Sequence, residues 1–411
     1  MEPASAQELL DHACAEFSVP GAQLGLVRGD ERLLVSSGVM AVGTDRPVTA
    51  GTAFHAGSLA KSLAGLTVLR AARDGHLDLD APCSEQGEGL WEETPRVLLT
   101  QTSGRANLLP DPEDELEDFV ARAGAAPLVH APGRFSYCNA GWSVLDLLLL
   151  RATGRSFEES AQELLGRRLT FEMPDDAAAG HAIGAGRPPM GVPATFAPAA
   201  SAAGSQWWVT GDQLLDYALL HLGGGQGRVD VQDIADVQQP AAALPGATVF
   251  DAWGMGFAAW QRGDHRAFGW AGYTGGHRAF LRGFPDQGAA VVVLANCAGP
   301  LFGPPGGSAL FDALLPRLLD DLAVPPLPAP AYDATPVPTA GLSGRFGPLV
   351  AEPAGPDGIT LHAEAFGVSD PVTCERLGGN TFSVRGNPPG STPFAFDDDL
   401  LYLGPFALPR G

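Results

Sequence analysis

The sequence is poor in lysine, in clusters of basic residues and in long apolar runs. Its 25 basic residues stand against 47 acidic ones, which gives a formal net charge of −22, and Lys61 is the single lysine. Because no group of basic residues offers a footprint for phosphate backbones or anionic lipid, nucleic acid is not an expected partner. The longest apolar runs, around 147–150 and 289–295, fall far short of the ~18 residues that suggest a membrane span. A membrane is therefore not an expected partner either.

Signatures of secretion and of several enzyme classes are also missing. The five cysteines form no C-x-x-C pair, and their odd number favours reduced core residues over a disulfide framework. The histidines show neither H-E-x-x-H nor H-x-x-E-H spacing, and no G-x-S-x-G elbow occurs, which disfavours a zinc hydrolase and an α/β-hydrolase. We expect neither a metal nor a cofactor. Residues 1–17 lack the basic and apolar regions of a secretory signal, so the expected location is cytoplasmic.

The single lysine follows a serine at a helical spacing. Arginine cannot release its proton near neutral pH, whereas an amine can, so Lys61 is a candidate for a position where deprotonation is needed, with chance survival of one lysine as the alternative. Apolar residues recur at helical spacing and predict a buried helix from Ser58 to Asp74. Positions three apart share one helical face, so the Ser58 hydroxyl and the Lys61 amine are expected to meet as nucleophile and base. Burial would lower the pKa of the amine, and the helix N-terminus would favour an oxyanion formed on Ser58.

Two further motifs lie downstream. Tyr137 and Asn139 are expected on a loop, ahead of an apolar helix at about 143–150, and an extended backbone would point both side chains the same way. By itself, this Y-x-N pattern is common and mostly structural. Residues 272–280 are rich in glycine and lead into two predicted strands of a β-hairpin. Its glycines would let a substrate lie against the backbone, and an N–H near Gly276 is the candidate for a second oxyanion donor.

In this order, the three motifs resemble those of the serine β-lactamase and penicillin-binding-protein-like family, specifically its class C β-lactamase and esterase branch. Phrases at 19–21, 75–80 and 98–104 are similar too, so the resemblance spans about residues 10–320. It implies Ser58 as the nucleophile toward an amide or ester carbonyl, Lys61 and Tyr137 as proton shuttles, and Asn139 as the residue that holds the acyl side chain. It also implies a β-lactamase-like α+β fold, in which helices flank an antiparallel sheet and form a helical subdomain.

The third motif departs from the family pattern. Tyr273 stands where lysine or histidine is usual, and a neutral phenol lacks the positive charge that helps to hold a carboxylate. Arg278 and His277 are the candidate replacements, and ordinary packing is the alternative for each. Gln101, where the family usually has histidine, is expected to be structural.

The remaining candidates would contact the substrate without reacting with it. The expected substrate-binding residues are Asn139, Tyr273, Thr274, Gly275, Gly276, Trp207 and Trp208. The two tryptophans precede a predicted helix over 213–222 that would line the entrance of the site, with core packing as the alternative for at least one of them.

Proline marks a boundary late in the chain. Six prolines between Val324 and Ala340 predict a stiff extended linker that cannot continue the preceding helix. Beyond it, short β-rich runs predict a small barrel or meander, which resembles the lipocalin-like domains appended to some relatives. These runs lie at 359–363, 381–384 and 400–403. The predicted organisation is a catalytic domain over 1–323, a linker over 324–340 and a small β-rich domain over 341–411.

The favoured hypothesis is a serine acyltransferase that forms an acyl-enzyme on Ser58. By its resemblance to amide-forming transacylases and peptide-cyclising thioesterases of antibiotic pathways, it would form an amide from an ester or thioester donor in secondary metabolism. The expected partners are a small-molecule ester, thioester or amide substrate and an amine acceptor. Water as acceptor would make it an esterase, amidase or β-lactamase-like hydrolase, and Tyr273 leaves an inactive binding homologue as a third interpretation. Schiff-base or pyridoxal-phosphate chemistry on Lys61 is disfavoured by the Ser58 spacing.

Overall fold

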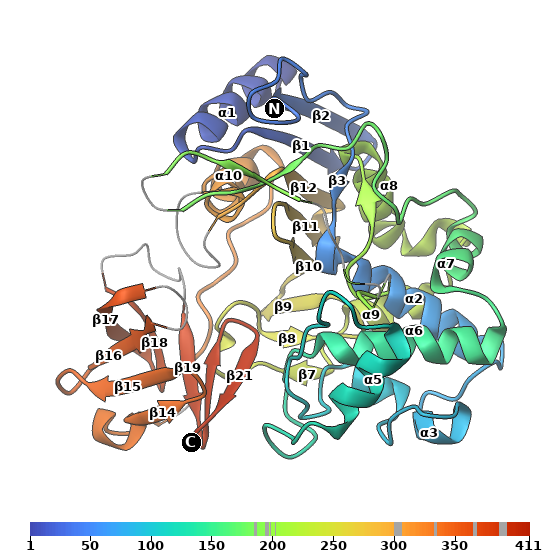
Figure 1. Ribbon diagram of the computed structural model, residues 1–411. Coiled ribbons are helices and arrows are strands. Elements are labelled where there is room, and N and C mark those ends of the chain that lie inside the picture. The colour runs from blue at the N-terminus through green and yellow to red at the C-terminus, as the bar shows by residue number, and fades with distance from the viewer. Residues whose placement is uncertain are drawn as a thin grey trace.

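The structure, a computed structural model, combines a large antiparallel sheet, helices beside and on both faces of that sheet, and a second β-domain at the C-terminal end (Figure 1). It describes residues 1–184, 187–193, 197, 199–201, 203–299, 306–332, 335–364, 368–385 and 393–411. This arrangement confirms the predicted α+β class with its small C-terminal β-domain.

The helices are α1 (Pro3–Glu16), α2 (Ala60–Arg73), α3 (Cys83–Gln86), α4 (Pro95–Leu99), α5 (Leu116–Ala125), α6 (Asn139–Thr153), α7 (Phe157–Leu165), α8 (Gly211–Leu222), α9 (Val231–Gln238) and α10 (Gly307–Asp321). Short 3-10 turns are η1 (Gly57–Leu59), η2 (Gly224–Gly227), η3 (Pro245–Ala247), η4 (Pro285–Gln287) and η5 (Thr339–Leu342). The strands before the linker are β1 (Gly21–Arg28), β2 (Glu31–Gly38), β3 (Phe54–His55), β4 (Gly180–Ala182), β5 (Met190–Val192), β6 (Trp208–Val209), β7 (Ala242–Ala243), β8 (Ala252–Trp253), β9 (Ala258–Arg262), β10 (His265–Tyr273), β11 (Arg278–Phe284), β12 (Ala289–Ala295) and β13 (Cys297–Ala298). Those after it are β14 (Gly344–Phe346), β15 (Leu349–Pro353), β16 (Gly358–Ala363), β17 (Val368–Gly378), β18 (Thr381–Val384), β19 (Phe394–Asp397), β20 (Leu400–Leu403) and β21 (Phe406–Pro409).

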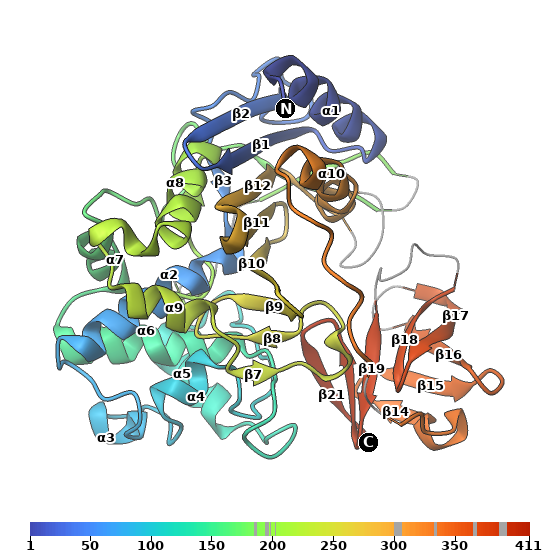
Figure 2. The same cartoon turned by 180° about the vertical axis from the view of Figure 1, so that it is seen from behind.

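The large sheet runs in the order β2-β1-β12-β11-β10-β9-β8-β7, and neighbouring strands are antiparallel. Its apolar centre is β12, in which every residue is buried, and Val293 of that strand lies opposite Leu24 of β1. α1 and α10 pack together against one face, and α8 packs against the other face over β1, β11 and β12 (Figure 2). A strand covered on both faces reads as a continuous apolar run, as β12 does.

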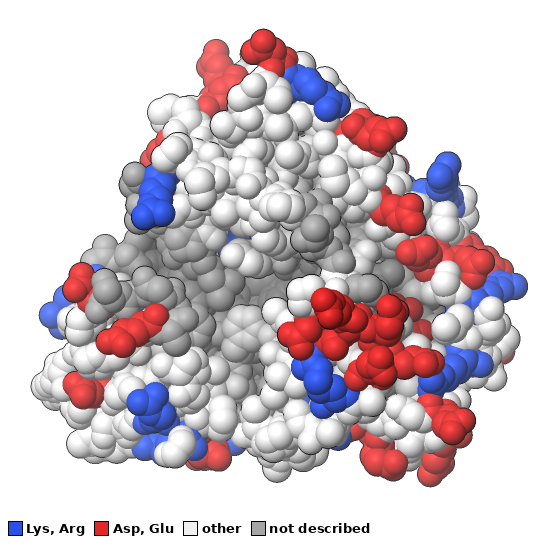
Figure 3. Space-filling model, viewed as in Figure 1, with Lys and Arg blue, Asp and Glu red and all other residues white. Residues whose placement is uncertain are grey.

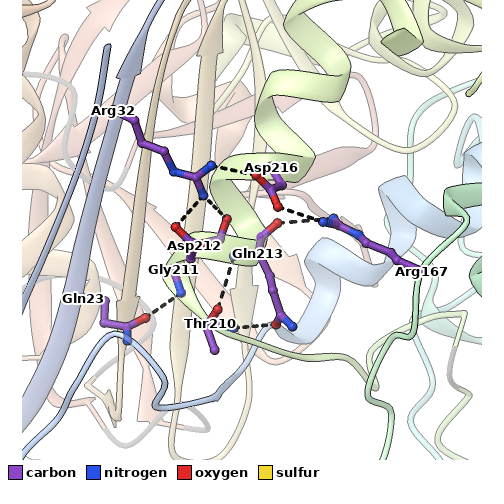
Figure 4. Close-up of polar contacts among 8 residues, drawn as sticks. All are labelled: Gln23, Arg32, Arg167, Thr210, Gly211, Asp212, Gln213 and Asp216. Atoms are coloured by element: carbon purple, nitrogen blue, oxygen red, sulfur yellow. Dashed lines mark hydrogen bonds and ion pairs between the residues drawn. The ribbon is translucent and has the colours of Figure 1, made fainter. Parts of the chain in front are cut away.

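Polar contacts hold α8 against the edge of this sheet (Figure 4). The side-chain oxygen of Gln23 on β1 accepts the N–H of Gly211 at 2.6 Å. Arg32 on the edge strand β2 pairs with Asp216 at 2.7 Å, and Arg167 approaches the other oxygen of Asp216 at 3.1 Å. These contacts tie an edge strand, α8 and the segment after α7 together.

A group of helices lies beside the sheet, with α2 at its centre. α2 packs against α6, α7 and α9, and nearly all of its residues are buried, so it is an interior helix. It begins directly after η1, and η1 packs against β10. The start of the most buried helix therefore lies beside a strand of the large sheet.

The C-terminal domain is an antiparallel meander that closes on itself. Its strands follow one another from β14 to β21, and the N–H of Gly347 donates to Pro409 O at 2.9 Å, which joins the first hairpin to the last strand. Phenylalanines fill its centre, among them Phe346, Phe382 and Phe396. The three predicted β-runs correspond to β16, β18 and β20.

The Pro-rich segment runs between α10 and η5. Residues 333 and 334 lie outside the described residues, and the described residues from Ala323 to Pro338 contain neither helix nor strand. The Arg262 guanidinium donates to Pro328 O at 2.9 Å, so this segment passes along β9. Within the described ranges, no helix is both long and apolar enough to traverse a bilayer.

Candidate active site

Ser58 lies in η1, directly before α2, where two backbone segments touch. Gly57 has φ +53°, and a Cβ there would lie 3.1 Å from Tyr273 N. A Cβ on Gly272 would lie 1.9 Å from Ala56 O, which real structures do not allow. Both positions need glycine because the backbone before Ser58 is pressed against the end of β10. This contact places Ser58 next to Tyr273.

Lys61 stands in the first turn of α2, and its side chain is fully buried. Its Nζ lies 3.3 Å from Ser58 Oγ, 2.8 Å from Asn139 Oδ1 and 2.6 Å from Gly204 O. Burial lowers the pKa of Lys61 from 10.5 to about 7. A large share of the amine is therefore neutral near pH 7, and a neutral Nζ can accept a proton from Ser58 Oγ.

Tyr137 covers the same amine from the other side. Lys61 Nζ lies 5.2 Å from the centre of the Tyr137 ring, and the Tyr137 side chain is buried. Burial raises the pKa of Tyr137 to about 12, and a hydrogen bond with the Ser58 hydroxyl acts in the opposite direction. Near pH 7 the phenol is therefore protonated, and it can donate to an atom that gains negative charge at Ser58. The ring packs against Trp270, with 5.6 Å between centroids.

Asn139 begins α6, four residues before the helix start that the sequence suggests. Its Nδ2 and its backbone N–H both donate to Asn107 Oδ1, at 2.9 and 3.0 Å. These two hydrogen bonds orient the side chain so that Asn139 Oδ1 faces Lys61. Asn107 has no motif around it, and sequence reasoning missed it.

Gln101 fixes the backbone between Tyr137 and Asn139. Its side-chain oxygen accepts the N–H of Cys138 at 2.7 Å, and its carbonyl accepts the N–H of Ser136 at 2.7 Å. Cys138 turns away, with Sγ 3.5 Å from Ala106 O. The alternation expected for Tyr137, Cys138 and Asn139 is present, and Gln101 has the structural position expected of it.

The third motif forms the turn between β10 and β11. Tyr273 is 46% exposed, Gly275 is exposed and Thr274 is partly buried. Gly276 is buried against β4, where its carbonyl accepts the N–H of His181 at 3.0 Å. The outer side of this turn, at residues 273–275, faces solvent next to Ser58.

His277 and Arg278 follow this turn, and both side chains are buried. Burial lowers the pKa of His277 to about 3, so the imidazole is neutral and supplies no positive charge at working pH. The Arg278 guanidinium lies over the ring of Tyr273. Burial lowers the pKa of Arg278 to about 10, which still leaves it charged near pH 7.

Trp207 and Trp208 lie behind the site. Their side chains are 1% and 2% exposed. Trp207 packs edge-on against Tyr217 of α8 at 5.3 Å, and Trp208 packs against His55 at 4.9 Å and His277 at 5.5 Å. Both tryptophans have the packing role given as the alternative, and neither contributes to the solvent-facing surface.

A hollow opens at the centre of the face shown in Figure 3, and acidic side chains gather on one side of it. The loop before α5 and the first turn of α5 carry exposed Asp111, Glu113, Glu115 and Asp118. In the part of the chain that the structure describes, no three His, Cys, Asp or Glu side chains group in a way that could hold a metal ion.

Comparisons with known proteins identify relatives of the chain as a whole. A family model described as Beta-lactamase matches residues 6–313. Penicillin-binding protein 4 of Amycolatopsis lactamdurans is 26% identical over 377 residues, which cover 83% of this chain and 96% of that protein. The crystal structure of SurE superposes with a TM-score of 0.78 at 25% identity, over 100% of this chain and 99% of that one. D-amino acid amidase from Ochrobactrum anthropi SV3, complexed with L-phenylalanine amide, shares the fold with a TM-score of 0.66 at 21% identity, over 78% of this chain and 99% of that one.

Proposed function

Because the chain belongs to the Beta-lactamase family of serine hydrolases and acyltransferases, we propose that it forms an acyl-enzyme on Ser58 and transfers the acyl group to an amine. The observation that carries this proposal is the fully buried Lys61 amine 3.3 Å from Ser58 Oγ, with a pKa lowered to about 7. A nucleophile beside a base of suitable pKa is the arrangement that covalent acyl transfer needs.

The first half-reaction uses the groups around Ser58. Neutral Lys61 takes the Ser58 proton while Oγ forms a bond to the acyl carbonyl carbon. The bond from that carbon to the leaving group then breaks, and the Tyr137 hydroxyl returns a proton to the departing oxygen, sulfur or nitrogen. Asn139 keeps the Lys61 amine in place through the 2.8 Å contact to its Oδ1. The N-terminal end of α2 favours the oxyanion that forms in between.

The second half-reaction decides between transfer and hydrolysis. An amine attacks the ester carbon, its proton passes to the Tyr137 and Lys61 pair, and Ser58 Oγ leaves and is reprotonated. Neutral Tyr273 at the solvent-facing turn weakens recognition of a free carboxylate and so favours an ester or thioester donor. The pathway in secondary metabolism and the cytoplasmic location stay predictions.

Hydrolysis is the second candidate. The names of the relatives refer to a penicillin and to D-amino acid amides, so an amide bond opened by water is the closest alternative chemistry. The two candidates share the acyl-enzyme and differ only in the acceptor.

Intact-mass spectrometry tests both half-reactions. A fluorophosphonate should add to the wild type once, and Ser58→Ala should remove the adduct, whereas Ser62→Ala, one turn further along α2, should keep it. Absence of the adduct from folded wild-type protein would favour an inactive binding homologue. Acylation with an activated ester, followed by a panel of amines, then separates the acceptors: an adduct that amines discharge faster than buffer supports transfer, and rapid loss that no amine diverts leaves a hydrolase.

A further inference from the structure

The C-terminal domain reaches the loop that carries Tyr137. The turn between β20 and β21 brings Pro405 O within 3.4 Å of the Tyr137 N–H, which donates to it. The next residue, Phe406, packs edge-on against the Tyr137 ring, with 5.8 Å between centroids and 86° between planes. Figure 1 shows β21 on the side of its domain that faces the large sheet and the helices.

Contacts from the same domain hold the residues just before Tyr137. The Tyr402 hydroxyl donates to Phe135 O at 3.0 Å, and both side chains are buried. The Arg134 guanidinium pairs with Asp397 at 2.6 Å and with Asp399 at 3.2 Å. The C-terminal domain therefore holds residues 134, 135 and 137 of this loop.

The catalytic part of the chain holds the loop from the opposite side. Trp253 and Trp270, on β8 and β10, pack against the Tyr137 ring at 6.1 and 5.6 Å. These rings and Phe406 enclose one phenol between two domains. Removal of Phe406 would free space beside the ring, while Ser58 and Lys61, which the C-terminal contacts do not touch, would keep their positions.

We propose that the C-terminal β-domain belongs to the catalytic unit, with Phe406 and Pro405 as positioning residues that hold the Tyr137 hydroxyl in line for proton transfer. The inference rests on the proposed acyl-enzyme chemistry and extends it to a residue about 350 positions after the nucleophile. A displacement of the hydroxyl on the order of 1 Å can cost up to about 10²-fold in rate.

The test compares Phe406→Leu with the wild type, each in the Tyr137 and the Tyr137→Phe background, by single-turnover acylation of the full-length chain. Two donors are used, a 4-nitrophenyl ester and an ethyl ester of the same acid, because only the poorer leaving group needs a proton. Phe406→Leu should slow acylation by the ethyl ester on the order of 10-fold or more. It should affect the nitrophenyl ester less, and it should cost nothing further once the Tyr137 hydroxyl is gone.

A matched control separates positioning from stability. Phe382 is a fully buried phenylalanine of the same domain, and none of its ring contacts involves Tyr137. Phe382→Leu should lower the unfolding midpoint at least as much as Phe406→Leu, with unchanged acylation per folded molecule. If Phe406→Leu does not fold, Tyr402→Phe, which loses the hydroxyl contacts to Phe135 O and to Arg134, takes its place.

The outcomes are distinguishable. Equal rate losses by Phe406→Leu in both Tyr137 backgrounds, or no loss at all, would overturn the positioning role while Ser58 chemistry stands. No acylation of the wild type by either ester would refute the proposed function, and this inference with it.

Discussion

The guanidinium carbon of Arg278 lies 3.5 Å from the centre of the Tyr273 ring. A cation stacked on an aromatic face is held by the ring quadrupole. A positive charge therefore lies directly behind the Tyr273 ring, but the phenol separates this charge from the solvent-facing side of the turn. A substrate at this turn meets a neutral, half-exposed ring.

A cation restored at this position should change donor preference. Tyr273→Lys should raise the acylation rate constant for a carboxylate-bearing β-lactam by about 5-fold relative to its methyl ester, the equivalent of ~1 kcal/mol for a solvent-exposed ion pair. The gain should shrink at high salt. Tyr273→Gln is the neutral control, and an equal gain with glutamine would show that loss of the ring, not charge, is responsible.

Replacement of Lys61 by arginine should abolish acylation. Arginine keeps the positive charge but cannot become neutral near pH 7, so Ser58 loses its proton acceptor. The expected loss is on the order of 10²–10⁴-fold, measured by burst kinetics with an activated ester. Folding should be checked by circular dichroism, and activity within threefold of wild type would rule out proton transfer to Lys61.

The acylation rate should rise with pH through about 7. Burial lowers the pKa of Lys61 to about 7, so the fraction of neutral amine increases up to that pH and levels off above it. Because the same amine has its ordinary pKa near 10.5 in the unfolded chain, its contribution to stability increases with pH between about 7 and 10.5. Single-turnover rates from pH 5.5 to 9 check the first part, and a flat profile would contradict it.

Two tyrosine hydroxyls should respond in opposite ways. Tyr137→Phe should slow acylation by esters with poor leaving groups and leave the unfolding midpoint nearly unchanged. Tyr217→Phe removes a buried hydrogen bond to Ser62, 3.0 Å long, and should lower the free energy of unfolding by about 1 kcal/mol at constant activity per folded molecule. Urea unfolding and acylation kinetics of both variants check these two expectations. A Tyr137→Phe variant that is unstable but fully active would make Tyr137 a structural residue.

Acid should destabilise the fold through buried histidines. Burial lowers the pKa of His55, His221 and His277 to about 3, so below pH 6.5 the unfolded chain binds protons that the folded chain excludes. Stability present above pH 6.5 is then lost as the pH falls, by up to about 4 kcal/mol per pH unit for three protons. His221→Phe should reduce the pH dependence of the unfolding free energy by the contribution of one proton, in urea titrations at pH 7.5, 6.5 and 5.5.

The sequence predicted best what is local in the chain. Ser58 and Lys61 are three apart in the continuous helical run of η1 and α2, so helical geometry alone brings them together. The strands β16, β18 and β20 follow from short β-rich runs between turn residues. The fold class followed from the resemblance of the three motifs to those of the β-lactamase family.

Sequence reasoning missed contacts between distant segments. Asn107 and Phe406 have no local signature, because each acquires its position only when it meets Asn139 or Tyr137. The start of α6 was misplaced for a related reason: Cys138 makes no side-chain cap, so no capping signal marks the helix start, and Asn107 binds the N–H of Asn139 there. An aromatic pair such as Trp207 and Trp208 looks alike in sequence whether it lines a site or packs beneath one.

The closed seam of the C-terminal barrel makes this domain sensitive to truncation. Arg410 and Gly411 are part of this seam, since the N–H of Gly411 donates to Arg345 O at 2.9 Å and the Arg410 guanidinium lies over the Phe346 ring. Trimming these residues would expose an unpaired strand edge, which is a template for aggregation. Removal of Arg410 and Gly411 should therefore increase aggregation of the protein.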